Sequence, residues 1–122
     1  MSSSTSHMSM LSYAIALLVV ITAAIHLYLS SQFPQPPDFI FLLNGLGYLG
    51  LLVALYFPYR RLLAVRKRIR WILIAYTTLT VVLWIFLGVR TPLGYFDKVI
   101  EIMLIGLLWL ENGRPQPAAD RP

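Results

Sequence analysis

A dense cluster of positive charge at residues 59–70 lies between two long apolar runs of this chain. The segment reads Tyr-Arg-Arg-Leu-Leu-Ala-Val-Arg-Lys-Arg-Ile-Arg and holds six of the ten Lys and Arg residues. A charge at the centre of a bilayer costs about 2.5 to 3.5 kcal/mol on the insertion scale. We therefore expect these residues to form a water-exposed loop at a membrane surface. Because short basic loops stay on the cytoplasmic side, this loop also predicts the orientation of the protein.

The composition agrees with a membrane protein. Of 122 residues, 58% are hydrophobic and 12% are charged, and the mean hydropathy is +0.72. Soluble domains have about 45–50% apolar and about 25% charged residues. The formal net charge of +5 is concentrated in one segment, so membrane topology explains it and we expect no nucleic-acid partner. The chain has no cysteine, which excludes disulfide, thiol-redox and cysteine-metal chemistry.

Four apolar stretches, residues 10–30, 39–58, 71–89 and 92–110, are predicted to cross the membrane. The first matches a hydrocarbon core of about 30 Å at 1.5 Å per residue. It is too long for the core of a signal peptide and lacks a cleavage site, so we expect it in the mature protein. Thr91-Pro92 is typical of a helix start. The fourth stretch fits a membrane least well, because three charged residues fall in its first half: Asp97, Lys98 and Glu101.

These stretches predict an all-α fold, a membrane-spanning four-helix bundle built as two antiparallel hairpins joined by the basic cytoplasmic loop. Eight of the ten cations then lie on the side of that loop, and only Arg90 and Lys98 lie opposite. Both termini are therefore expected inside the cell, in a plasma or inner membrane. The bundle covers residues 10–111, between disordered tails at 1–9 and 112–122. Residues 5–8 resemble a cloning-vector junction, so His7 carries no weight.

Small residues recur at helical spacing on the first two stretches. Glycine and alanine let a neighbouring backbone approach closely, which drives helix association in membranes. We expect five of them to be helix-packing positions: Ala16, Ala23, Gly47, Gly50 and Ala54.

Each predicted span also places a polar or polar-tipped side chain at a similar depth on the side opposite the basic loop. Ionisable residues inside a span are costly and by default indicate a site with partners. We expect His26 to pair with Asp97 or Glu101, and Lys98 to be the counter-ion. The full candidate layer is His26, Asn44, Trp84, Asp97, Lys98 and Glu101.

Structural interpretations compete with a functional one at each of these positions. His26 is either a hydrogen-bonded core residue or a group that carries protons or binds a ligand. Haem b ligation by His26 is the weakest option, because only one histidine lies in a span and four-helix haem sites normally need a second axial ligand. Asp97 is either a helix N-terminal anion or part of the site, and Asn44 is an interhelical hydrogen-bonding residue. No metal and no cofactor is expected.

Several short motifs resemble an uncharacterised family of small four-helix prokaryotic, largely archaeal, integral membrane proteins. They are His26-Leu-Tyr-Leu, the run Phe41-Leu-Leu-Asn-Gly-Leu-Gly-Tyr-Leu, the basic segment, Tyr76, Trp84, and Asp97-Lys98 with Glu101. The resemblance implies the four-helix membrane fold and no known activity. Asn44 and Glu101 depart from the family pattern, which favours His26, Asp97 and Lys98 as the shared polar residues.

The sequence therefore predicts a small multi-pass membrane protein that is not an enzyme, because no nucleophile, base and acid form a convincing set. Our first hypothesis is an accessory, structural or partner-binding component, with a membrane-protein partner or a second copy of the chain. The alternative is a proton-coupled carrier or small-ligand-binding protein that uses the polar layer. The bilayer is the expected partner in either case, with anionic headgroups at Arg60, Arg61, Arg66, Lys67, Arg68 and Arg70.

Overall fold

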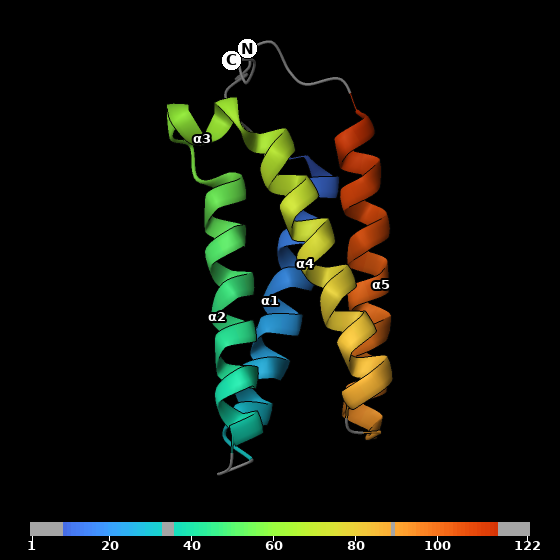
Figure 1. The fold of residues 1–122 in the computed structure, drawn as a ribbon. Helices are drawn as coiled ribbons and strands as arrows, with labels where there is room; N and C mark the ends of the chain where they lie inside the picture. Colours follow the sequence, from blue (N-terminus) through green and yellow to red (C-terminus); the bar gives the residue numbers. More distant parts are fainter. Residues whose placement is uncertain (1–8, 33–35, 89, 115–122) are drawn as a thin grey trace.

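The computed structural model describes residues 9–32, 36–88 and 90–114, and these residues form helices without any strand. Four helices are long and one is short. Figure 1 shows the four long helices lying side by side, with the short helix across one end. The elements are α1 (Met10–Ser30), α2 (Pro36–Tyr56), α3 (Arg60–Ala64), α4 (Arg66–Leu87) and α5 (Pro92–Gly113).

Side-chain caps start two of the long helices. Before α1, Ser9 Oγ accepts a hydrogen bond from the backbone N–H of Ser12 at 3.1 Å. Before α5, Thr91 Oγ1 accepts one from the backbone N–H of Gly94 at 3.0 Å, and proline follows at the first helical position. Such caps satisfy backbone donors that have no partner inside the helix. The Thr91-Pro92 pair thus begins α5 where the sequence predicts it.

The basic segment is helical, and our prediction of a loop at residues 59–70 is wrong. Its residues form α3 and the first turn of α4. The reason is an apolar stripe within the basic sequence: Ile69 is buried, and Leu62 and Val65 pack against the core. Apolar residues three and four positions apart stabilise a helix that lies against a protein surface while its charges face water.

The predicted boundaries of the second, third and fourth spans also change. The second apolar stretch forms a helix that ends at Tyr56, before Pro58, and α4 begins five residues earlier than the predicted third span. Asn112 and Gly113 belong to α5, so the predicted tail at 112–122 is wrong in its first two positions. The disorder predicted for 1–8 and 115–122 lies outside the described residues.

The four long helices pack in a closed ring. Helix α1 contacts α2 and α5, and α4 contacts the same two helices from the other side. Figure 1 shows that α1 begins, and α5 ends, at the end of the molecule where α3 lies. Consecutive long helices therefore run in opposite directions, and α1 and α4 end at the far end, where α2 and α5 begin.

Three of the helices, α1, α2 from Phe39 and α4, are long and apolar enough to cross a membrane. Helix α5 is as long as α4 and has the same number of charged residues, but those of α4 lie within its first five residues, whereas those of α5 are spread from Asp97 to Glu111. All four of its charged residues are buried against the other helices: Asp97, Lys98, Glu101 and Glu111. Its outward face exposes large apolar side chains instead, namely Tyr95, Phe96, Val99, Ile102, Met103, Trp109 and Leu110.

The predicted packing positions differ in their surroundings. Ala23 is buried, Ala16 and Ala54 are half-buried, and a Cβ on Gly47 would overlap the hydroxyl of Tyr76. Gly50 is exposed, and a Cβ there would meet no atom within 4 Å, so its prediction as a packing position within this chain is wrong. The close approach of α1 and α2 occurs at Gly45 instead, where a Cβ would lie 2.9 Å from Leu27.

Candidate functional site

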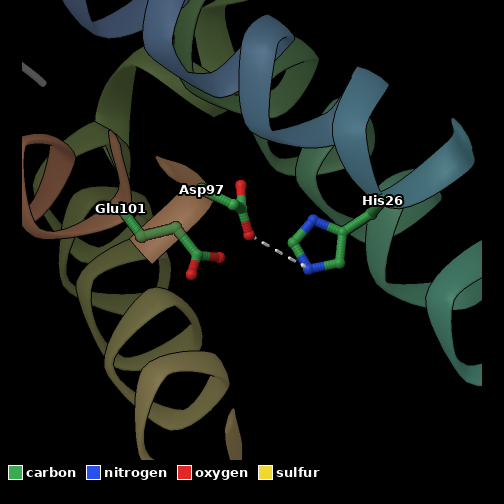
Figure 2. A group of neighbouring side chains, drawn as sticks. All are labelled: His26, Asp97 and Glu101. Carbon is green, nitrogen blue, oxygen red and sulfur yellow. Dashed lines mark ion pairs between the residues drawn. The ribbon is translucent and has the colours of Figure 1, made fainter. Parts of the chain in front are cut away.

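A buried cluster of charged side chains connects α1 and α5 near the end of the molecule opposite α3. His26 projects from α1, and Asp97, Lys98 and Glu101 project from α5, with exposed fractions between 0% and 7%. Figure 2 shows that Asp97 and Glu101 lie on the same side of α5, and that Asp97 is the carboxylate nearer to His26. The spacing of four residues between the two acids places them one helical turn apart on one face.

Lys98 is the internal counter-ion of the cluster. Its Nζ lies 3.2 Å from Asp97 Oδ2 and forms a closer ion pair with Glu101 Oε1. A buried ion pair is tolerated only when further hydrogen bonds satisfy the remaining polar atoms. Here Thr22 Oγ1 donates to Asp97 Oδ1 at 2.6 Å, and Tyr48 OH donates to Glu101 Oε2 at 2.6 Å.

His26 is held by both a hydrogen bond and ring contacts. Its Nδ1 lies 2.8 Å from the carbonyl oxygen of Thr22, one turn earlier in α1. Its ring is tilted against those of Phe41 and Tyr48, with centroids 6.1 and 5.8 Å away. Its Nε2 lies 3.7 Å from Asp97 Oδ2, the ion pair marked in Figure 2. That separation is too long for a hydrogen bond.

A cavity of about 370 Å³ adjoins the cluster, and all four long helices contribute to its lining. His26, Asp97 and Lys98 form part of the wall, together with Asn44 and Trp84. The remaining lining is mostly apolar and includes Leu29, Ile40, Leu83 and Leu87. Small-molecule sites in proteins are typically concavities of about 300–1,000 Å³, lined by apolar side chains and a few convergent polar groups.

Asn44 and Trp84 belong to the cavity wall and not to the hydrogen-bonded cluster. Asn44 Nδ2 lies 3.5 Å from Thr80 Oγ1 on α4, and Asn44 Oδ1 is buried without a hydrogen-bond partner. The Trp84 ring packs edge to face with Tyr95 at 5.0 Å. The Arg90 guanidinium lies 4.1 Å from the centroid of the Trp84 ring, and Lys98 Nζ lies 5.9 Å from it. The six predicted residues thus lie around one region. His26, Asp97, Lys98 and Glu101 form the charged cluster, whereas Asn44 and Trp84 contribute to the cavity wall.

One nitrogen or oxygen atom from each of His26, Asp97 and Glu101 lies within 4.8 Å of the others, which is close enough to hold a metal ion. Lys98, however, already contacts both carboxylates with its ammonium group. A metal ion in this position would have to displace that ammonium, because two cations cannot share the space between the same carboxylates. The chemistry of the donor set therefore favours an internal lysine over a metal.

A second polar cluster joins all four long helices at the end where α3 lies. Its centre is Glu111 on α5, which is 6% exposed. Glu111 accepts a short hydrogen bond from Ser12 Oγ of α1 and bonds of 3.0 and 2.9 Å from Tyr56 OH of α2. Arg70 of α4 completes the set, with Nε 2.7 Å from Glu111 Oε1. Each helix therefore contributes one side chain to one carboxylate.

The two polar clusters are separated by an apolar layer. On α1, α2 and α5, a fully buried aliphatic side chain lies between the residues of the two clusters, and on α4 a fully buried leucine follows Arg70 by three positions. Such a layer excludes water and ions from the space between the clusters. These residues are Ile15, Val19, Leu55, Leu73, Leu104 and Leu108, each with 0% exposure.

The cations of the basic segment fall into two groups. Arg60, Arg61, Lys67 and Arg68 are exposed, as lipid-headgroup contacts require. Arg66 and Arg70 are half-buried and bind the protein: Arg66 Nε donates to the carbonyl oxygen of Leu55 at 2.9 Å, and Arg70 pairs with Glu111. The structure thus gives these two arginines partners within the protein, and contact of the six side chains with lipid headgroups stays a prediction.

Sequence reasoning missed several residues of both clusters. Thr22 precedes His26 by four positions and Tyr48 follows Asn44 by four positions, so helical spacing alone places each beside a predicted site residue. Glu111 was harder to predict as a site residue, because a charged residue at the end of an apolar stretch is typical of an ordinary helix boundary. Its partners Ser12, Tyr56 and Arg70 come from three other helices, and no local pattern in the sequence connects them.

Comparison of this chain with family models, with curated proteins and with solved structures found no match. The resemblance to an archaeal membrane-protein family thus stays a prediction from the motifs.

Proposed function

We propose that this chain is an integral membrane protein with four spans that binds a small ligand in the cavity between its helices. The cavity carries the proposal: it has the volume of a small-molecule site, and His26, Asp97, Lys98 and Asn44 converge on it. Burying four ionisable side chains in a membrane protein is costly, and such residues usually mark a functional site. A purely accessory component, our first hypothesis from the sequence, gives no reason for a cavity beside this cluster.

The contacts of α5 support its role as the fourth span. A helix with four charged residues can lie in a bilayer when those residues face other helices and are paired there. The charged residues of α5 meet this condition, and its exposed side chains are apolar. We infer that the four spans, with the exposed cations beside α3, orient both termini and α3 to the cytoplasmic side, as the distribution of Lys and Arg favours.

Single-cysteine labelling tests this topology, since the chain has no cysteine of its own. Gln32→Cys and Arg90→Cys lie at exposed positions of the two connections far from α3, and Ala64→Cys and Arg114→Cys at exposed positions near α3. An impermeant maleimide should label the first pair in intact cells and the second pair only after permeabilisation. Labelling of both Arg90→Cys and Arg114→Cys in intact cells would show that α5 does not cross the membrane.

Filling the cavity tests ligand binding. Leu29→Trp adds bulk to the cavity wall, whereas Leu17→Trp makes the same change on the same helix at a side chain that is 60% exposed. We expect the unmodified protein and Leu17→Trp to retain a small molecule through purification, and Leu29→Trp to retain about tenfold less, because the ring occupies the ligand volume. Native mass spectrometry of protein extracted from membranes measures this. Equal retention by Leu29→Trp, or no retention by any of the three proteins, would contradict the proposal.

A further inference from the structure

The charged side chains on the cavity wall already have partners of opposite charge. Asp97 Oδ2 lies 3.7 Å from His26 Nε2 and 3.2 Å from Lys98 Nζ. Lys98 also pairs with Glu101, and the hydroxyl of Thr22 donates to Asp97 Oδ1 at 2.6 Å. Each charged group that lines the cavity therefore finds its counter-charge within the protein.

A charged molecule would gain little from this wall. Asp97 and Lys98 both line the cavity, and their ionic atoms are 3.2 Å apart, so a charge of either sign would be attracted by one and repelled by the other. Moving an unpaired charge from water into apolar surroundings is very costly. The wall therefore favours an uncharged occupant. Most of the remaining lining is apolar and includes Leu29, Ile40, Leu83 and Leu87.

One polar atom of the wall residues is unsatisfied. Among the residues that the structure describes, Oδ1 of Asn44 is the single buried side-chain nitrogen or oxygen atom without a hydrogen-bond partner. Thr80 donates its hydroxyl proton to the carbonyl oxygen of Tyr76 at 3.0 Å, so towards Asn44 it can only accept. The amide NH₂ of Asn44 therefore faces Thr80, and Oδ1 is the atom left over. A buried acceptor without a donor costs free energy, which a donor on a ligand would recover.

The Asn44 side chain is held weakly enough to turn towards the cavity. It is half-buried and forms part of the wall. Its distance of 3.5 Å to Thr80 is at the long limit of a hydrogen bond, so little is lost when the amide turns. A small turn would present Oδ1 to a molecule in the cavity, and this molecule would need an O–H or N–H group to bind it.

We propose that the cavity binds an uncharged molecule with a compact apolar body and one hydroxyl or N–H donor, an inference that rests on the ligand-binding function proposed above. The apolar body packs against the aliphatic wall, and the donor binds Oδ1 of Asn44. The ion pairs of His26, Asp97 and Lys98 stay intact, because an uncharged occupant needs no counter-ion.

Four probes with the same phenyl body separate these requirements. 2-Phenylethanol is uncharged and carries a donor, and propylbenzene is uncharged and carries none. At neutral pH, 2-phenylethylamine is a cation and phenylacetate is an anion. Isothermal titration of the protein in nanodiscs measures each affinity, with empty nanodiscs as the blank for partitioning into lipid. We expect 2-phenylethanol to bind one saturable site at least about tenfold more tightly than either charged probe, since a charge would be desolvated without a free counter-ion.

Asn44→Leu connects that binding to the cavity. The variant removes the acceptor and keeps the wall apolar, so we expect the affinity for 2-phenylethanol to fall about fivefold, as for one lost hydrogen bond. The affinity for propylbenzene should change less than about twofold, which separates a lost hydrogen bond from lost space. Asn112→Leu makes the same change near the end of α5, outside the cavity, and should leave both affinities unchanged. Asn44→Ala removes the same acceptor with less bulk and replaces Asn44→Leu if that variant does not fold.

Three outcomes would overturn the inference: binding of either charged probe as tightly as 2-phenylethanol, no saturable binding of 2-phenylethanol, or no selective loss of its affinity in the Asn44 variant. In each case, a small molecule retained by the unmodified protein and lost in Leu29→Trp would still support a ligand-binding function. Failure of the retention experiment would instead remove the proposed function itself.

Discussion

Replacing Lys98 with methionine should lower the free energy of unfolding by about 3–5 kcal/mol, the usual cost of removing one partner of a buried ion pair. The side chain is 7% exposed and contacts both Asp97 and Glu101. Without its ammonium group, two carboxylates would lie together in a space that excludes water. Unfolding of purified protein in mixed micelles, monitored by circular dichroism as denaturing detergent is added, measures the change.

The chain supplies a matched control for this substitution. Lys67 is the other lysine, and it is exposed in the first turn of α4. Lys67→Met should change the free energy of unfolding by less than about 0.5 kcal/mol, as expected of surface substitutions. Adding Glu101→Gln to Lys98→Met restores the net charge of the cluster and keeps an acceptor for Tyr48, so most of the stability should return. A loss below about 1 kcal/mol for Lys98→Met would contradict the buried ion-pair network.

Arg70→Met should cost about 2 kcal/mol of unfolding free energy, since hydrogen bonds to charged groups are worth about 1.5–3 kcal/mol. Arg70 is 13% exposed and donates from Nε to Glu111 and from Nη1 to Asn112. Its loss would leave Glu111 with only the hydroxyl donors Ser12 and Tyr56. The same unfolding measurement in mixed micelles applies.

Arg68→Met is the control, because Arg68 lies two residues away in the same helix and is exposed. It should change the stability by less than about 0.5 kcal/mol. A double-mutant cycle of Arg70→Met with Glu111→Gln should give a coupling energy of about 1 kcal/mol or more. Equal effects of the two arginine substitutions, or no coupling, would mean that Arg70 serves the membrane surface in the same way as its neighbours.

The helices were the part most accessible to sequence reasoning, because apolar runs of about 20 residues and the Thr91-Pro92 cap are local signals. The basic segment was read wrongly for an equally local reason. Its charges dominate the composition, and they concealed an apolar stripe through Leu62, Val65 and Ile69 that makes the segment helical. Gly50 shows the opposite error, since small-residue spacing cannot tell which face of a helix meets a neighbour.

In the candidate site, the depth of each polar residue along its apolar stretch predicted that six of them lie in one region. Depth alone could not tell which of the six contact one another. The structure joins His26, Asp97, Lys98 and Glu101 in one charged cluster, and Asn44 and Trp84 line the cavity beside it together with three of those residues. That arrangement depends on the rotation of each helix about its axis. Rotation is decided by side-chain packing between helices, which no single stretch of sequence encodes.

The sequence by itself determined that the chain is helical, that it is rich in segments apolar enough for a membrane, and that its charge lies chiefly in one short segment. These properties depend on the average character of residues that are neighbours in the chain. Only the tertiary structure decided which polar groups meet. Thr22 and Asp97 are 75 positions apart, and Ser12 and Glu111 are 99 apart. Their contacts, and the cavity beside the first pair, exist because four helices pack in one register, with their charged faces turned towards one another and their apolar faces outward.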